Sequence, residues 1–361
     1  MRIALDAMGG DNAPYEIVWG GVLAAAKTND DIILVGNEAE IRDALKIKHP
    51  KIRPLPDAEA LINSGRVRIV HTEESVAMDD APAAAVRRKK NCSINICMRM
   101  VKEGEADAAV SAGNSGAMAA SALFILGRIK GVARPAIATV MPTADADRPL
   151  LLLDAGANTD CHHEWLREFA VMGDVYSRLV LGREKPEVGL MSIGTEDCKG
   201  NELTKHAFPV LRDYTPGIHF KGNVEGHDVF EGQTDVIVCD GFVGNVILKT
   251  SESAAHAMSD WLKRIIKSRF VYKMAALALL PALRLFKQRM DPEIHGGAPL
   301  LGVPGAVIIT HGSSSYKAIF YACAAGSRAA SHNVSKEIEE HIAKLPPIPL
   351  EDEQNASCGA Q

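Results

Sequence analysis

The sequence predicts an α/β fold in which a mostly parallel sheet is wrapped by helices in three layers. Two observations predict it. Short apolar segments alternate with helical segments along nearly the whole chain, and most of the apolar segments end in a turn rich in Gly, Asn or Ser. In such sheets, ligands bind beyond the carboxyl ends of the strands. We therefore expect the binding site among these turns.

The expected elements follow in chain order. Strands are expected over residues 2–5, 31–35, 67–70, 108–110, 136–141, 150–153, 188–193, 218–221, 235–239 and 306–310. Helices are expected between them, most clearly over residues 14–26, 115–126 and 162–181. The polar turns begin at Asp6, Ser111, Asp154, Gly194, Gly222, Asp240 and His311. Turns also need Gly and Asn for geometry alone, so each has a purely structural interpretation as well.

Composition bounds the kind of protein. The chain has 361 residues, of which 47% are hydrophobic and 24% charged, a balance typical of a globular protein with a sizeable core. We expect one large domain over residues 1–345 and a disordered, polar tail over residues 346–361. The net charge of −5 does not indicate nucleic-acid binding. Seven cysteines without a pairing pattern, and no secretory segment before the first strand, favour a cytoplasmic protein.

The turn after residues 108–110 is the clearest candidate for a binding site. Gly113 and Gly116 let the backbone bend tightly and approach a ligand. Asn114 and Ser115 are residues that cap helices, and the first turn of a helix carries free N–H groups. This turn therefore predicts a pocket for an anion.

Several familiar chemistries are disfavoured. The chain has no G-x-G-x-x-G after its first strand, no Walker lysine and no G-x-S-x-G elbow. Backbone amides, asparagines and a few lysines bind oxyanions and polarise carbonyls, so we expect no cofactor. Cys161, His162 and His163 open a helix, where adjacent side chains point in different directions, so we expect no zinc site there.

Residues 261–290 interrupt the α/β pattern. The segment holds eight basic and no acidic residues around an apolar stretch, residues 274–283, that is too short to cross a bilayer. We expect a helical arm over about residues 255–290, formed by two helices that meet at an apolar tip. Its tip could enter a membrane surface, its sides could form a dimer interface, or its basic residues could bind an acidic partner. The candidate contact residues are Lys263, Arg264, Lys267, Leu277, Leu279 and Leu280.

Several longer motifs resemble the bacterial phosphate acyltransferases of phospholipid synthesis, the PlsX family. The motifs cover residues 6–14, 110–117, 153–158, 222–226, 240–249 and 296–303. The resemblance runs from Met1 to about Ala330. The chain departs from the family pattern at Ser115, where Thr is usual, at Thr195, where an acidic residue is usual, and at His295, where Tyr is frequent.

The resemblance implies an acyl transfer from acyl-[acyl-carrier protein] to inorganic phosphate, which gives acyl phosphate and free carrier protein. It also implies a fold like that of isocitrate dehydrogenases and phosphate acetyltransferases, and a homodimer. The dimer would work at the cytoplasmic face of the membrane and supply a membrane glycerol-3-phosphate acyltransferase.

Phosphate is the nucleophile in this chemistry, so the site needs oxyanion pockets rather than a catalytic Ser or Cys. We assign substrate binding to Asp6, Gly9, Gly10, Asp11, Ser111, Gly113, Asn114, Ser115, Gly116, Asn158 and Asp240, the aspartates orienting hydrogen-bond donors. Lys199 or Lys249 would assist phosphate, and Asn223 and Asn245 would polarise the thioester carbonyl. His311 is either a proton carrier or a structural residue bonded to backbone. Arg87, Arg88 and Lys89 would dock the carrier protein.

Two alternatives stay open at this point. One is another enzyme of the same fold, above all a phosphate acetyltransferase that uses acyl-CoA. The other is a non-catalytic scaffold on a membrane surface, which would leave the polar turns without a purpose.

Overall fold

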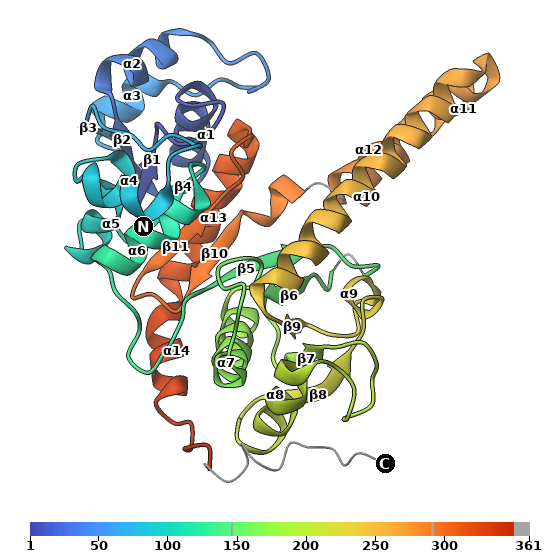
Figure 1. The fold of residues 1–361 in the computed structure, drawn as a ribbon. Coiled ribbons are helices and arrows are strands. Elements are labelled where there is room, and N and C mark those ends of the chain that lie inside the picture. Colours follow the sequence, from blue (N-terminus) through green and yellow to red (C-terminus); the bar gives the residue numbers. More distant parts are fainter. Residues whose placement is uncertain (146, 290–291, 350–361) are drawn as a thin grey trace.

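The computed structural model describes residues 1–145, 147–289 and 292–349, and its strands form one sheet of eleven strands (Figure 1). The order across the sheet is β3-β2-β1-β4-β11-β10-β5-β6-β9-β7-β8. The strands are β1 (Arg2–Asp6), β2 (Asp31–Gly36), β3 (Val67–His71), β4 (Ala108–Ser111), β5 (Ala136–Met141), β6 (Leu150–Leu153), β7 (Glu187–Met191), β8 (His219–Val224), β9 (Val236–Val238), β10 (Ala298–Leu301) and β11 (Ala306–Ile309).

The sheet consists of two halves that run in opposite directions. Strands β3, β2, β1, β4 and β11 are parallel to one another, and so are β6, β9, β7 and β8. Three antiparallel steps lie between the halves, β11 to β10, β10 to β5 and β5 to β6. Because this number is odd, the carboxyl ends of the first half lie at one edge of the sheet and those of the second half at the other.

Helices cover both faces of the sheet, as the strand alternation requires. Ile3 and Leu5 of β1 pack into one core, whereas Ala4 between them packs into a second core on the opposite face. The first core holds residues of α1 (Tyr15–Lys27), α7 (His163–Leu179), α8 (Glu202–Asp213), α13 (Tyr316–Ser331) and α14 (Val334–Ile342). The second holds residues of α4 (Pro82–Arg88), α5 (Ser93–Lys102) and α6 (Ser115–Ile125). The predicted three-layer fold is confirmed.

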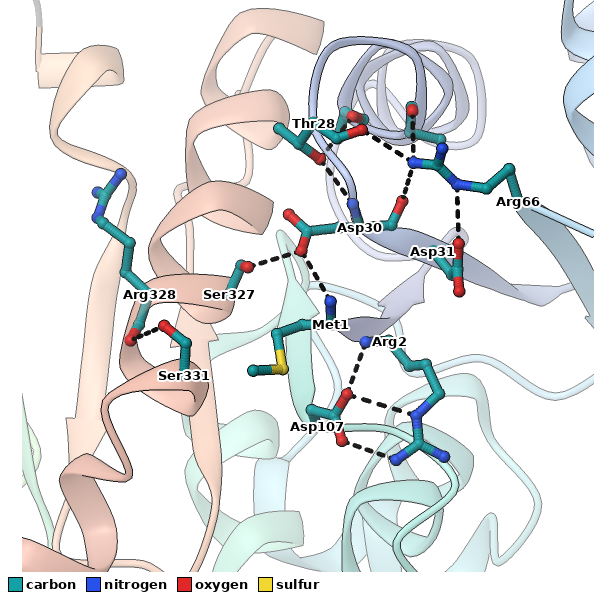
Figure 2. Close-up of polar contacts among 12 residues, drawn as sticks. Met1, Arg2, Thr28, Asp30, Asp31, Arg66, Asp107, Ser327, Arg328 and Ser331 are labelled. Atoms are coloured by element: carbon teal, nitrogen blue, oxygen red, sulfur yellow. Dashed lines mark hydrogen bonds and ion pairs between the residues drawn. The ribbon is translucent and has the colours of Figure 1, made fainter.

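Ion pairs fasten the amino ends of the first-half strands, away from the polar turns (Figure 2). The Met1 ammonium and the Ser327 hydroxyl of α13 both bond Asp30 just before β2, at 3.1 and 2.7 Å. Arg2 pairs with Asp107 just before β4 at 2.7 Å. These contacts therefore hold the amino ends of β1, β2 and β4 together.

The arm projects from the body and is built from three helices rather than two (Figure 1). Helix α10 (Gly241–Ser268), 28 residues long, starts in the body directly after β9 and continues into the arm. The chain turns at Arg269 into α11 (Phe270–Ala278) at the tip, and α12 (Leu280–Arg289) returns along α10. Among the described residues, no helix combines the length and apolarity needed to cross a membrane.

Several elements were not expected from the sequence. They are the helices α3 (Ala58–Asn63), α9 (Asp228–Glu231) and α14, the 3-10 turn Pro292–His295 and the antiparallel strand β10. Helix α2 (Glu38–Lys46) falls where a helix was expected. The expected end of the strand at residue 221 was wrong, because β8 continues through Gly222 to Val224. The predicted tail falls mostly on residues 350–361, which lie outside the described residues.

Candidate active site

A buried carboxylate organises the carboxyl edge of the first half. Asp6 ends β1 and is 1% exposed. Its Oδ2 accepts the Ser111 hydroxyl at 2.6 Å, and the Ser111 Oγ accepts the Gly113 amide at 3.0 Å. Its Oδ1 accepts the Met8 amide at 3.2 Å. Burial raises the pKa of the Asp6 carboxyl, and the hydrogen bond from Ser111 opposes that shift. One side chain thus holds the turn after β1 against the turn after β4.

Glycines allow these two turns to touch. A Cβ on Gly9 would lie 2.4 Å from the Asp6 Oδ2 and 2.8 Å from the Gly113 amide nitrogen. Gly10 has φ +105°, and a Cβ there would lie 2.9 Å from the carbonyl oxygens of both Ala112 and Gly312. Three turns, after β1, β4 and β11, therefore meet at one place with their backbones in contact.

Helix α6 starts from this junction and points its first turn at it. The Asn114 Oδ1 caps the helix by accepting the Ala117 amide at 3.0 Å. Its Nδ2 donates to the carbonyls of Met78 and Asp80 at 3.1 and 3.2 Å. Asn114 is therefore committed to structure, whereas exposed Ser115 and Gly116 carry first-turn N–H groups that have no partner within a helix. These amides, rather than the Asn114 side chain, are suited to an anion.

The turn after β11 completes the junction. Asp11 donates its amide to the Gly312 carbonyl at 2.8 Å, and the Asn12 Nδ2 donates to the Ser313 carbonyl at 3.1 Å. The exposed His311 accepts the Ser313 amide on Nδ1 at 3.2 Å. In the neutral ring this places the proton on Nε2. Both predicted roles of His311 are compatible with this geometry, since Nδ1 is tied to the loop while Nε2 is not. We refer to Gly9–Asn12, Gly113–Gly116 and His311–Ser313 together as the cradle.

A second aspartate organises the opposite edge of the sheet. Asp154 follows β6 and is fully buried. Its Oδ1 accepts the amides of Ile137, Gly156 and Ala157 at 3.0–3.1 Å, and its Oδ2 accepts the backbone and side-chain nitrogens of Asn158 at 2.7 and 2.9 Å. Burial raises the pKa of this carboxyl too, and the hydrogen bonds from the Ala157 amide and Asn158 oppose the shift.

Three other residues predicted for this edge of the sheet, where the second-half strands end, form hydrogen bonds with the backbone around them. The Asn158 Nδ2 also donates to the Pro135 carbonyl at 2.8 Å, and the Asn158 carbonyl accepts the Gly241 amide at 2.7 Å. Asp240 caps α10 by accepting the Val243 amide at 2.8 Å. The Asn223 Nδ2 donates to the Glu196 carbonyl at 2.8 Å, which ties β8 to the loop of residues 192–201.

Three predicted residues of the second half of the sheet are exposed. Lys199 lies in the loop of residues 192–201, and Asn245 on the first turns of α10. The Lys249 ammonium pairs with Glu252 at 2.9 Å. Among the described residues, no hydrogen bond or ion pair joins these side chains to the cradle. Because β10 and β5 reverse the direction of the second half, these three residues follow strand ends that point opposite to those that carry the cradle.

The basic segment at the end of α4 belongs to a helix that packs along α6. Lys89 bonds Asp80 at 2.7 Å and the Ser75 carbonyl at 2.8 Å, so it holds the loop that binds Asn114. The Arg87 guanidinium lies 4.5 Å from the ring centre of Phe124 on α6, and Arg88 is exposed. Lys89 is therefore a structural cation, and Arg87 and Arg88 are the ones that face outward.

Sequence reasoning missed the loop Met78–Asp80 as part of the site. It supplies both carbonyls that fix Asn114, and the side chain of Pro82 lies against Gly116. The available signal was the run Met-Asp-Asp-Ala-Pro over residues 78–82 before a helix, but it follows no strand end directly. Its contact with α6 is a tertiary contact that no local pattern predicts.

The class of protein follows first from the fold. The EutD phosphotransacetylase from Staphylococcus aureus is similar with a TM-score of 0.58 at 15% identity, covering 91% of this chain and 94% of that chain. A phosphotransacetylase from Streptococcus pyogenes gives 0.59 at 16% identity, covering 92% and 94%. This chain therefore has a phosphate acetyltransferase-like α/β fold, as predicted.

The sequence then gives the family. Residues 1–337 match the family described as "Fatty acid synthesis protein". A protein named phosphate acyltransferase from Moorella thermoacetica is 49% identical over 88% of this chain and 89% of its own length. Its namesake from Desulfitobacterium hafniense is 47% identical over 96% and 98%. The chain belongs to the phosphate acyltransferase family and is an acyltransferase, which confirms the family resemblance.

Proposed function

We propose that the enzyme transfers a long-chain acyl group from acyl-[acyl-carrier protein] to inorganic phosphate, and that the product feeds glycerol-3-phosphate acylation in phospholipid synthesis. The observation that carries the proposal is the cradle. Backbone amides from the first turn of α6 face a junction of three glycine turns, which is a geometry that binds a phosphate oxyanion. Family membership supplies the acyl transfer, and the cradle supplies a place for phosphate.

The reaction needs no enzyme nucleophile. An oxygen of hydrogen phosphate attacks the thioester carbon, the new C–O bond forms, and the C–S bond breaks. The proton of hydrogen phosphate ends on the departing thiolate, so charge and atoms balance. A thiol with a pKa of about 8.5 leaves without a strong acid. We assign the transfer of that proton to His311 in the cradle, and the proposed reaction requires no cofactor.

The test is phosphate-dependent release of thiol from a long-chain acyl-carrier protein, run beside acetyl-CoA and without added metal. We expect release from the carrier substrate. Release from acetyl-CoA alone would instead establish a phosphotransacetylase, and release from neither would favour the scaffold.

Variants separate the two edges in the same assay. Deleting the α6 cap by Asn114→Ala should lower turnover at least tenfold, because it removes the bonds that fix the first turn. Lys199→Ala and Lys249→Ala test whether either lysine of the second half assists phosphate. If all three variants stay within a few-fold of wild type, phosphate binds elsewhere.

The arm supports a cytoplasmic enzyme that binds the inner membrane face as a homodimer. Apolar side chains are exposed both along α10, where Trp261 is 63% exposed, and at the tip, where Phe270 is 76% exposed. We assign the α10 face to a second copy of the chain and the tip to the membrane. There the product would pass to the membrane glycerol-3-phosphate acyltransferase.

Vesicle flotation tests the tip. Leu277→Glu with Leu279→Glu should abolish binding to anionic vesicles while phosphate-dependent turnover and the sedimentation of the dimer are unchanged. Binding that survives this change would exclude the tip as the membrane contact.

A further inference from the structure

A groove between α7 and α8 carries an unusual set of side chains. It has a volume of about 500 Å³ and lies beyond the second edge of the sheet, so it does not include the cradle. Five of the seven residues that line it have nitrogen, sulfur or carboxylate donors that bind metals. They are Cys161, His162, His163, Glu202 and His206.

Two imidazoles from different helices lie close together in this groove. His163 is the first residue of α7, and His206 lies on the second turn of α8. Their ring centres are 5.9 Å apart, and their planes are inclined by 32°. Ring centres roughly 5–6 Å apart are what two imidazole nitrogens about 2.0–2.1 Å from one ion produce. The sequence argument against a metal considered only Cys161, His162 and His163 on one helix, whereas the second helix brings His206.

The backbone sets the tautomer of His206. Its Nδ1 lies 2.7 Å from the Glu202 carbonyl oxygen, which can only accept a hydrogen bond. Nδ1 therefore carries the proton, and the lone pair of the neutral ring is on Nε2. A ligating histidine typically has this arrangement, in which the distal N–H is fixed by a backbone carbonyl.

We propose that His163 and His206 bind one divalent first-row transition ion, such as Zn²⁺, across the groove. Within the described part of the chain, no third donor from His, Cys, Asp or Glu joins this pair within 4.8 Å. Water, or a rotated side chain of exposed His162 or Glu202, completes the coordination. The Cys161 thiol donates to the Asn158 carbonyl at 3.5 Å and so belongs to the turn after β6.

Such an ion would link two loops of the second half. Helix α7 follows the turn built on Asp154, and α8 follows the loop of residues 192–201 that is tied to Asn223. Fixing the first turn of α7 and the second turn of α8 would stabilise this edge without entering the cradle. The proposal does not depend on the proposed substrate.

Calorimetric titration of the full chain with ZnCl₂ tests the site. Wild type should bind one equivalent, and His163→Gln and His206→Gln should each weaken binding at least about tenfold. His332→Gln is the matched control, because the His332 Nδ1 makes the same bond to a carbonyl one turn earlier, that of Arg328 at 3.0 Å. Cys198→Ser controls for the exposed thiol. Both control variants should bind as wild type does.

Thermal unfolding and spectroscopy provide a second readout. Saturating Zn²⁺ should raise the Tm of wild type and of His332→Gln but not of either groove variant, since an ion that binds only the folded state stabilises it. Cu²⁺ in the same site should show two nitrogen ligands by electron paramagnetic resonance. Equal affinity in wild type and both groove variants, or no binding by wild type at 1 mM Zn²⁺, would overturn the proposal. The Tm of each variant without metal first shows that the variant is folded. If only one of the two groove variants folds, that variant alone tests the proposal.

Discussion

The two halves of the sheet use the same device in different ways. Each has a buried aspartate at the end of a strand, Asp6 after β1 and Asp154 after β6, and a turn rich in small residues follows each. Asp154 accepts five hydrogen bonds from its own turn and from β5. Asp6 accepts from Met8 in its own turn and from Ser111 at the end of the neighbouring strand.

The two carboxylates differ in which hydrogen-bond donors they occupy. Around Asp154 the amides of the turn are used by the carboxylate, and Asn158 closes the turn against Pro135 and Gly241. Around Asp6 the carboxylate instead joins the turns after β1 and β4, and the first-turn amides of α6 are left facing the cradle. An aspartate before a small-residue turn thus indicates a fixed backbone, and only its neighbours decide whether a ligand can bind.

Removing the Asp154 carboxylate should produce the largest effect on stability. Asp154→Ala removes the common acceptor of four backbone amides and the Asn158 side chain, so we expect a loss of roughly 3–5 kcal/mol in the free energy of unfolding. Urea denaturation measures it. Asp6→Ala should cost less stability but more activity. An equal or larger loss of stability in Asp6→Ala would remove the distinction between the two carboxylates.

Crowding the cradle should produce the largest effect on catalysis. The methyl group of Gly9→Ala must displace either the Asp6 carboxylate or the Gly113 amide, so we expect kcat/KM to fall about 100-fold with only a modest change in Tm. The matched variant is Gly226→Ala after β8, where a Cβ meets no atom within 4 Å. It should stay within about twofold of wild type. Comparable losses in both would place chemistry at the second edge as well.

The sequence predicted the strands well because each is a short apolar run with a clear end. It also located Asp6, Ser111, Gly113 and the start of α6, because these residues are adjacent along the chain to the strand ends they serve. It did not predict the reversal of the second half. That reversal depends on β10, four residues long, pairing antiparallel with β11 and β5, and no local pattern specifies such partners.

The same limit applies to the other residues assigned to the site. Asn158, Asp240 and Asn223 have the residue types and positions of ligand-binding groups, yet each has a backbone partner in its own half. Whether a polar side chain at a turn is free depends on what packs around it. The pairing of His163 with His206 across two helices was equally invisible, since 42 residues separate them along the chain.

Docking of the carrier protein should follow the edge that carries the cradle. Arg87→Glu places a negative charge beside α6, so the KM for the acidic carrier substrate should rise roughly tenfold while the KM for phosphate stays constant. Lys336→Glu on α14 makes the same change of charge away from the cradle and should have no effect. Inhibition by added salt should weaken in the Arg87 variant, because one attractive charge is gone. An unchanged KM would move the docking surface to the arm.

The smallest expected effect concerns the link between the halves. Glu168 on α7 accepts the amide of Ala133, in the segment that leads from α6 to β5, at 2.8 Å. Burial raises the pKa of its carboxyl from 4.5 to about 7. The folded protein therefore holds this proton more tightly than the unfolded chain does, so stability falls as pH rises from about 4.5 to 7 and is level above. Because the Glu168 carboxyl is partly exposed, we expect the unfolding free energy to fall by only about 1 kcal/mol over this pH range.

Glu168→Gln tests this expectation, because the variant keeps an oxygen acceptor but cannot ionise. The difference in unfolding free energy between variant and wild type should therefore grow in the variant's favour across this range, whereas exposed Glu339→Gln should show no such trend. If this difference in unfolding free energy stays constant with pH, the hydrogen bond from the Ala133 amide offsets the effect of burial on the pKa of Glu168. The contact between α7 and the segment that leads to β5 would then be independent of pH.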